Sequence, residues 1–193
     1  MTIHHDKMAY GKLNSLTDEF SEERLQEMVG RLSGQEKPER EYDKMIRGEL
    51  YNPADEELTM LRKQVRRLFY RYNNSEEDEQ ELRRDLLHRI FGKHGEHFYC
   101  EPPIRFDYGI NTEIGENFFS NFNLTILDVA HVKIGKQCFI GPNVSIVTPV
   151  HPMLACDRNM RPDGKGGMFD YEYARPITIE DNVWLQTSRC AAA

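Results

Sequence analysis

The spacing of apolar residues along the chain changes near residue 100. Before that point, apolar side chains recur every three or four positions, which is typical of amphipathic helices. The clearest helix is expected to begin at Asn52, a residue type that caps helices well, with Pro53 in the first turn. Its apolar face would consist of Leu58, Leu61, Val65, Leu68 and Tyr72.

Three further helices are expected in this half of the chain. One begins at Ser75, where Asp78 completes a capping box. A shorter one contains Met45 and ends at Gly48, and another covers residues 21–33. Helices with this pattern carry no chemistry of their own, so we interpret them as a cap packed on a larger body. The acidic balance of the chain argues against DNA binding by a pair of these helices.

From about residue 104 the hydrophobic period becomes six. A half-buried β-strand would have a period of two, whereas a period of six indicates a triangular solenoid. In such a prism the first and fifth residues of each hexad point inward, and stacked coils bury each other's apolar faces. The sequence therefore predicts a mainly β fold, a parallel β-helix preceded by an α-helical N-terminal module. The inward pairs would be Phe122–Ile126, Asp128–Val132, Ile134–Cys138, Ile140–Val144, Ile146–Val150 and Ile179–Val183, with Ile114 and Phe118 two residues out of phase.

Composition and charge exclude several classes of function. Hydrophobic residues make up 39% of the 193 residues and charged residues 30%, which suits a chain with a real core. The net charge of −7 offers no basic field to phosphate backbones, so a general nucleic-acid binder is not expected. The four cysteines form no CxxC pair, and no secretory signal or apolar run of ~20 residues is present. We therefore expect a cytoplasmic protein with no membrane partner.

His151 is the strongest candidate for chemistry among the seven histidines. It lies in the segment VTPVHP, where the hexads stop and a loop over 151–175 interrupts the prism. Histidine suits a general base because it exchanges protons near neutral pH, and the mouth of a loop is well placed to face a substrate. The isolated sequence favours a plainer interpretation, a turn histidine before Pro152.

Two other patterns bear on a site. Asp128 occupies a hexad position that is normally aliphatic. A buried carboxylate is costly there, so this oddity favours a site residue over a structural one. The spacing of His94, His97 and Cys100 could hold zinc, but no fourth ligand stands nearby, so we interpret them as a loop without metal.

Four stretches of the chain resemble the maltose/galactoside O-acetyltransferases, a branch of the left-handed parallel β-helix acyltransferases. They are residues 42–58, 106–128, 134–152 and 173–184, and they occur in the order found in the family. The resemblance implies a left-handed β-helix preceded by a helical module. It also implies a homotrimer with active sites between neighbouring subunits, acetyl-CoA as the donor, a sugar hydroxyl as the acceptor, and no metal.

The resemblance gives His151 a catalytic role, because the family's base occupies this His-Pro motif. Glu172 would support His151 by holding the imidazole in the right tautomer, as the third member of a catalytic triad does. The alternative for Glu172 is a solvated glutamate of the loop.

Four more positions match binding residues of the family. Asp107, Asn121 and Asp128 would line the sugar groove, where carboxylates and amides can pair with hydroxyl groups. Trp184 would lie on the acetyl-CoA side. Asn121 could instead be a stacked corner asparagine, and Trp184 could cover the end of the prism.

The hydrophobic pattern and the resemblance together divide the chain into four parts. Residues 1–41 form an extension with one helix, residues 42–99 the helical module, and residues 100–187 an incomplete β-helix that contains the 151–175 loop. The segment 188–193 does not follow the repeat. Because family members continue through further coils after this point, we expect a C-terminally truncated β-helix.

The leading hypothesis is an enzyme that transfers acetyl groups from acetyl-CoA to a sugar hydroxyl of a maltose-, glucose- or galactoside-like acceptor. One alternative is a truncated, non-catalytic product or assembly partner of the same family. Another is a hexapeptide acyltransferase that acts on a different acceptor, such as an amine.

Overall fold

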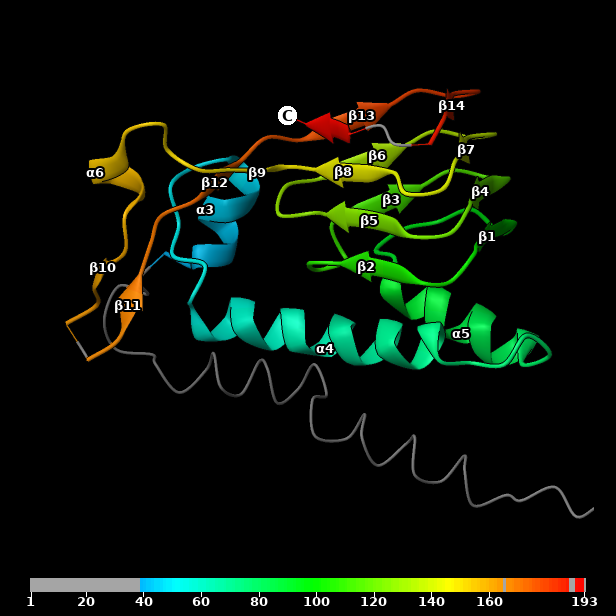
Figure 1. Ribbon diagram of the computed structural model, residues 1–193, viewed down its shortest axis with the longest axis horizontal. Helices are drawn as coiled ribbons and strands as arrows, with labels where there is room; N and C mark the ends of the chain where they lie inside the picture. The colour runs from blue at the N-terminus through cyan, green and yellow to red at the C-terminus, as the bar shows by residue number, and fades with distance from the viewer. Residues whose placement is uncertain (1–38, 165, 188–189, 193) are drawn as a thin grey trace, which may run out of the picture. The chain divides into compact units, whose positions relative to one another are not determined.

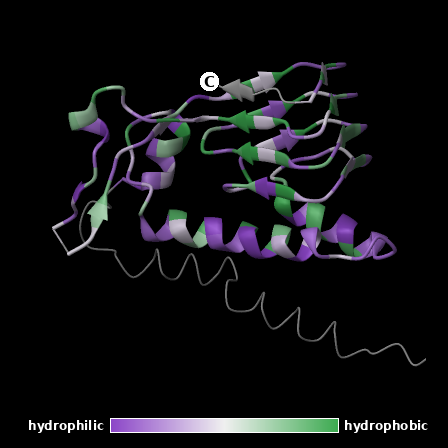
Figure 2. Ribbon diagram, viewed as in Figure 1, coloured by the Kyte–Doolittle hydropathy of each residue, from purple (hydrophilic) through white to green (hydrophobic). Residues whose placement is uncertain are grey.

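The computed structural model describes residues 39–164, 166–187 and 190–192. The compact unit from Arg40 onward contains helices first and then short parallel strands wound into coils (Figure 1). Figure 2 shows that the strands of the coils are rich in hydrophobic residues, while α4 is largely hydrophilic. The helix expected over 21–33 lies outside the described residues. No helix in the described part of the chain is long and apolar enough to cross a membrane.

The helices precede the coils, as the change of period predicts. They are α3 (Glu41–Arg47), α4 (Glu56–Asn73) and α5 (Gln80–Ile90). The helix α3 ends at Gly48, whose φ of 75° is the left-handed conformation that glycine adopts without steric cost. A Cβ at this position would lie 2.7 Å from the carbonyl oxygen of Ala174, so glycine also permits close contact with the β-helix unit.

The start of α4 differs from the prediction. Asp55, rather than Asn52, is the N-cap, and its carboxylate accepts hydrogen bonds from the amides of Glu57 and Leu58. Asn52 instead accepts a hydrogen bond from the amide of Ala54, which forms a turn before the helix. Both residue types can accept hydrogen bonds from the free backbone amides of a helix start. Asp55 is the one that directly precedes Glu56, the first residue of α4.

The predicted capping box at Ser75 is also wrong. The Ser75 hydroxyl donates a hydrogen bond to the carbonyl oxygen of Tyr72, so it satisfies the end of α4 rather than the start of α5. Residues between the two helices form a turn, and α5 begins only at Gln80. A serine can serve either helix end, and pattern alone does not distinguish the two.

Three parallel sheets form the faces of the coils. Partner residues in the first three coils are 20 positions apart, as in Phe98 with Phe118 and Thr112 with Val132. The long loop raises this separation to 45 positions before the last coil, as in Phe139 with Trp184. The first sheet contains β1 (Phe98–Cys100), β4 (Phe118–Ser120), β7 (Phe139–Ile140) and β14 (Trp184–Leu185). The second contains β2 (Ile104–Phe106), β5 (Leu124–Leu127), β8 (Ser145–Val147) and β15 (Cys190–Ala192). The third contains β3 (Thr112–Ile114), β6 (Val132–Ile134) and β13 (Ile177–Ile179).

The core lies inside these coils, and the hexad register describes only part of it. Ile134, Ile140 and Ile146 point inward as predicted and are at most 2% exposed. Phe122 was expected to point inward, but it is 49% exposed, and Leu124 is fully buried in its place. The reason is the coil length. Three hexads would give about 18 residues, and the observed 20 shift the register by two.

Candidate active site

The candidate site lies on one edge of the β-helix, at the corner that holds the extra residues of each coil. In the first coil this corner separates β2, which ends at Phe106, from β3, which begins at Thr112. In the second coil it separates β5 from β6, and in the third it is replaced by the loop between β8 and β13. Because these strands pair in register, the three corners stack, and Asp107, Asp128 and the loop that carries His151 come from the same edge.

The loop leaves this edge through a paired stem. The strand β9 (Pro149–Val150) runs antiparallel to β12 (Tyr173–Ala174), with Val150 opposite Tyr173. Between them lie α6 (Ala155–Arg158) and a hairpin of β10 (Arg161–Pro162) and β11 (Met168–Phe169). The stem therefore fixes His151 and Glu172 as facing neighbours at the base of the loop.

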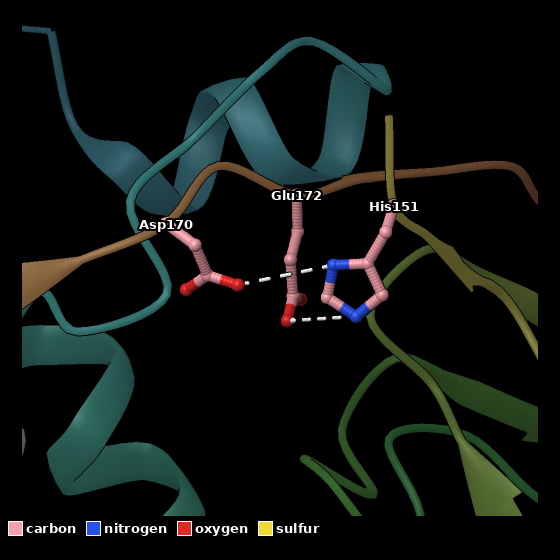
Figure 3. Close-up of side chains that lie close together, drawn as sticks. All are labelled: His151, Asp170 and Glu172. Carbon is pink, nitrogen blue, oxygen red and sulfur yellow. Dashed lines mark ion pairs between the residues drawn. The ribbon is translucent and has the colours of Figure 1, made fainter. Parts of the chain in front are cut away.

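Figure 3 shows two carboxylates that face the imidazole of His151 from the same side, each near a different ring nitrogen. Its Nδ1 lies 3.8 Å from Oδ2 of Asp170, and its Nε2 lies 3.8 Å from Oε1 of Glu172. The His151 side chain is 50% exposed, while those of Asp170 and Glu172 are 25% and 20% exposed. The arrangement is a solvent-accessible imidazole with one carboxylate near each ring nitrogen.

Glu172 is held in place by Tyr51, which lies just before α4. The phenol of Tyr51 donates a hydrogen bond of 2.7 Å to Oε2 of Glu172, and the two backbones exchange hydrogen bonds. Burial and the neighbouring Glu172 carboxylate raise the pKa of Tyr51, so the phenol stays protonated and can donate. With Oε2 occupied, Oε1 is the oxygen that faces His151.

Asp107 lies at the first corner, among charged groups. Burial raises its pKa, and the guanidinium groups of Arg62 and Arg66 oppose that shift, while the charge of Glu172 adds to it. Arg62 itself donates hydrogen bonds to the hydroxyl of Tyr108 and to the carbonyl oxygen of Pro53. Asp107 therefore belongs to the same polar edge as Glu172.

The surroundings of Asp128 differ from those expected of a residue that lines a sugar groove. It is fully buried, and its carboxylate accepts hydrogen bonds from the amide of Tyr108 and the hydroxyl of Thr112. Burial raises its pKa to about 6, against the opposing effect of these bonds. Since both carboxylate oxygens are used to hold the preceding corner, we assign Asp128 a positioning role rather than contact with a sugar.

Asn121 and Trp184 are not brought to His151 within this chain. Asn121 lies before β5, at the opposite end of that strand from Asp128, where its side chain accepts a hydrogen bond from the amide of Phe122. The stacked corner asparagines are Asn123 and Asn143, joined by a side-chain hydrogen bond of 3.0 Å. Trp184 is 68% exposed on β14, beside Phe139.

Sequence reasoning missed Asp170 and Tyr51. Asp170 stands two positions before Glu172, and side chains at that spacing share one side of an extended segment. This spacing could have indicated that Asp170 lies on the same side of the segment as Glu172. Tyr51 is 121 residues from its partner Glu172, and nothing in its local sequence points to the contact.

Comparison with known proteins places these features in context. A model described as "Maltose acetyltransferase hexapeptide capping motif" matches residues 44–95, the helical segment. A relative from Dictyostelium discoideum is 40% identical over 145 residues, which cover 75% of this chain and 70% of the relative.

Two solved structures share the fold of the described unit. One is a galactoside acetyltransferase in complex with coenzyme A, with 33% identity and a TM-score of 0.70, covering 80% of this chain and 72% of that one. The other is a maltose O-acetyltransferase from Clostridium difficile, with 37% identity and a TM-score of 0.72, covering 80% and 78%. At 33% and 37% identity the similarity to both extends beyond the fold to the sequence.

Proposed function

The chain belongs to the maltose/galactoside O-acetyltransferase family, and we propose that it transfers an acetyl group from acetyl-CoA to a hydroxyl group of a sugar. The observation that carries this proposal is the accessible imidazole of His151, with Asp170 near its Nδ1 and Glu172 near its Nε2. An alcohol is a poor nucleophile at neutral pH, and a base within reach of its proton is the main requirement for acyl transfer.

In the proposed reaction, His151 accepts the proton of the sugar hydroxyl as that oxygen attacks the carbonyl carbon of the thioester. A carbon–oxygen ester bond forms and the carbon–sulfur bond breaks. His151 then returns the proton to the departing sulfur, which leaves as the free thiol of coenzyme A. The imidazole is regenerated, so the step needs no other acid or base.

Asp170 and Glu172 would have different roles, because they face different nitrogens of the His151 ring. Asp170 faces Nδ1, so an Nδ1–H that points at Asp170 would leave Nε2 with its lone pair as the base. Glu172 faces Nε2 and so lies on the side that the acceptor hydroxyl must approach. The tautomer role expected of Glu172 is therefore reassigned to Asp170. Both distances are 3.8 Å, and catalytic hydrogen bonds are often long before substrate binds.

A polyhydroxyl acceptor suits the polar edge beside His151. Asp107 and Glu172 offer acceptor oxygens, and Arg62 offers donors close to them. Sugar hydroxyl groups both donate and accept hydrogen bonds, so such mixed groups can orient them.

We further propose a homotrimer with left-handed coils, in which α3, α4 and α5 form the helical module of residues 42–99. Support for the oligomer comes from the position of Asn121 and Trp184, which lie at other edges than His151 in one chain. They could take part in sugar and acetyl-CoA binding only if a second copy brings them to the His151 edge. That arrangement places each site between two subunits.

Release of coenzyme A thiol tests the function. The chain would be incubated with acetyl-CoA and glucose, maltose or a galactoside, beside His151→Ala and an amine acceptor. We expect thiol release with at least one sugar and its loss in the variant. Equal release by His151→Ala, or release with the amine alone, would overturn the proposal.

A further inference from the structure

We propose that His151, Asp170 and Glu172 also form a binding site for a divalent transition-metal ion, such as Zn²⁺, and that the bound ion inhibits the enzyme. The inhibition rests on the proposed function, because it assumes that His151 is the base. The binding does not, since it depends only on the three side chains. The ion would be a regulator of the site and not a participant in acetyl transfer.

The geometry brings three ligands of the right kind together. One ligand atom from each residue lies within 4.8 Å of the other two. Imidazole nitrogen and carboxylate oxygen bind Zn²⁺ at roughly 2.0–2.2 Å, so neighbouring ligands around a tetrahedral ion are about 3.4 Å apart. The two separations of 3.8 Å involve different ring nitrogens, Nδ1 for Asp170 and Nε2 for Glu172, and a single ion binds only one of them. The spacing that applies to one ion is therefore the limit of 4.8 Å, and side-chain rotations must shorten it to bring all three ligands to bonding distance.

The backbone holds these ligands in place before any ion arrives. Asp170 and Glu172 alternate along one extended segment, and the pairing of β9 with β12 sets His151 opposite them (Figure 3). The hydrogen bond from Tyr51 to Oε2 of Glu172 leaves Oε1 free to coordinate. Outer hydrogen bonds of this kind orient metal ligands and commonly change affinity by about 10- to 100-fold.

Charge and access also favour a cation. Within the residues that the structure describes, neither Asp170 nor Glu172 forms an ion pair with a lysine or arginine. Two carboxylates beside a neutral imidazole balance the charge of a divalent ion. His151 is 50% exposed, so water can complete the coordination sphere. An imidazole ligand favours Zn²⁺, Co²⁺ or Ni²⁺ over Mg²⁺, which prefers oxygen ligands alone.

Inhibition follows from the ligand chemistry. A metal ion binds the imidazole through the same lone pair that the base uses to accept a proton. The imidazole can therefore hold the ion or accept the proton from that nitrogen, but not both. A chelator should restore activity because no covalent bond is formed with the ion.

The chain offers a matched control away from this site. His88 on α5 and His94 face each other, with Nδ1 of His88 3.0 Å from Nε2 of His94. This pair presents two imidazoles without a carboxylate between them and has no part in the proposed reaction. The double variant His88→Asn/His94→Asn therefore removes a competing histidine pair and should leave the proposed site intact.

Calorimetric titration of the full chain with ZnCl₂, and visible absorption with CoCl₂, test the binding directly. We expect the two-histidine control to bind like wild type. Asp170→Asn, Glu172→Gln and His151→Asn should each weaken binding by at least about tenfold. Zinc should also inhibit thiol release by the wild type, and a chelator should reverse the inhibition.

The outcomes separate the two proposals. Zinc binding that is lost in the His88/His94 variant, or kept in both Asp170→Asn and Glu172→Gln, overturns this inference. A chain that releases thiol with a sugar but neither binds zinc nor is inhibited keeps its proposed function and loses the metal site. A chain that binds zinc through these residues but acetylates no acceptor supports the metal site and loses the proposed function.

Discussion

The phenol of Tyr51 donates a 2.7 Å hydrogen bond to the carboxylate of Glu172, which lies 121 residues further along the chain. This bond joins the segment before α4 to the base of the loop that carries His151. The helical segment therefore contributes to the candidate site, and it does so through a side chain that is itself 1% exposed.

Replacement of Tyr51 by phenylalanine should weaken both stability and activity. Hydrogen bonds to charged groups contribute about 1.5–3 kcal/mol, and within the described residues Tyr51 is the only side chain that donates a hydrogen bond to Glu172. We expect a decrease of about 1–2 kcal/mol in the free energy of unfolding by urea, and slower thiol release. Tyr42→Phe is the control, because it removes a hydrogen bond from a tyrosine to the neutral amide of Asn111. If both variants lost activity equally, the role of Tyr51 at the site would be refuted.

Asp128 should make the fold more stable at mildly acidic pH. Its pKa in the folded chain is about 6, above the ordinary value of 3.8, because burial disfavours the charged form. A raised pKa means that the folded state binds more protons between these values. The contribution of Asp128 to stability is therefore largest at low pH and is lost as pH rises through about 6, by roughly 2–3 kcal/mol.

Urea unfolding at pH 5 and pH 7.5, compared between wild type and Asp128→Asn, measures this effect. An asparagine keeps the acceptor for Tyr108 and presents an amide to Thr112, so the corner can be retained. We expect the variant to lose much of the pH dependence that wild type shows. The comparison removes the contribution of the histidines, which both proteins share. A pH dependence that was the same in both would show that Asp128 does not titrate in this range.

The sequence predicted the class of the fold and the loop but not the length of the coil. Period six was visible at Ile134, Ile140 and Ile146 because no extra residues interrupt that stretch. The corner before β6 holds two more residues than a hexad allows, and this moved Phe122 out of the core. The two extra residues are visible in the sequence as the phase shift of Ile114 and Phe118, but the hydrophobic pattern alone does not place them at the corner before β6.

Two substitutions distinguish the observed register from the hexad register. Leu124 is fully buried, so Leu124→Ala should cost about 2–5 kcal/mol through lost contacts and the cavity left behind. Phe122 is 49% exposed, and Phe122→Ala should change stability by no more than about 0.5 kcal/mol. Thermal or urea unfolding of the two variants gives the comparison. If Phe122→Ala lost more stability than Leu124→Ala, the hexad register, with Phe122 inside the coil, would be the correct one.

For the candidate site, the sequence predicted His151 and Glu172 but not their arrangement. The loop between them was evident, while the pairing of β9 with β12 that sets them face to face is a tertiary feature. Asp128 shows a different limit of the sequence. Its unusual place in a hexad indicates a special role, but a buried carboxylate can stabilise backbone amides as well as bind a ligand. Only the hydrogen-bond partners decide between these roles.

Asp170→Asn should separate the positioning of His151 from binding of the acceptor. If Asp170 holds the Nδ1–H tautomer, its loss should lower kcat by about 10- to 100-fold and leave KM for the sugar nearly unchanged. Glu172→Gln, on the side of Nε2, should raise KM for the sugar as well as lower kcat. Steady-state kinetics with the best sugar acceptor measures both constants.

Asp157→Asn, in α6 of the same loop, is the matched control and should behave as wild type. A fall in kcat for Asp157→Asn equal to that for Asp170→Asn would assign the effect to the loop as a whole. An unchanged kcat in Asp170→Asn would return the tautomer role to Glu172.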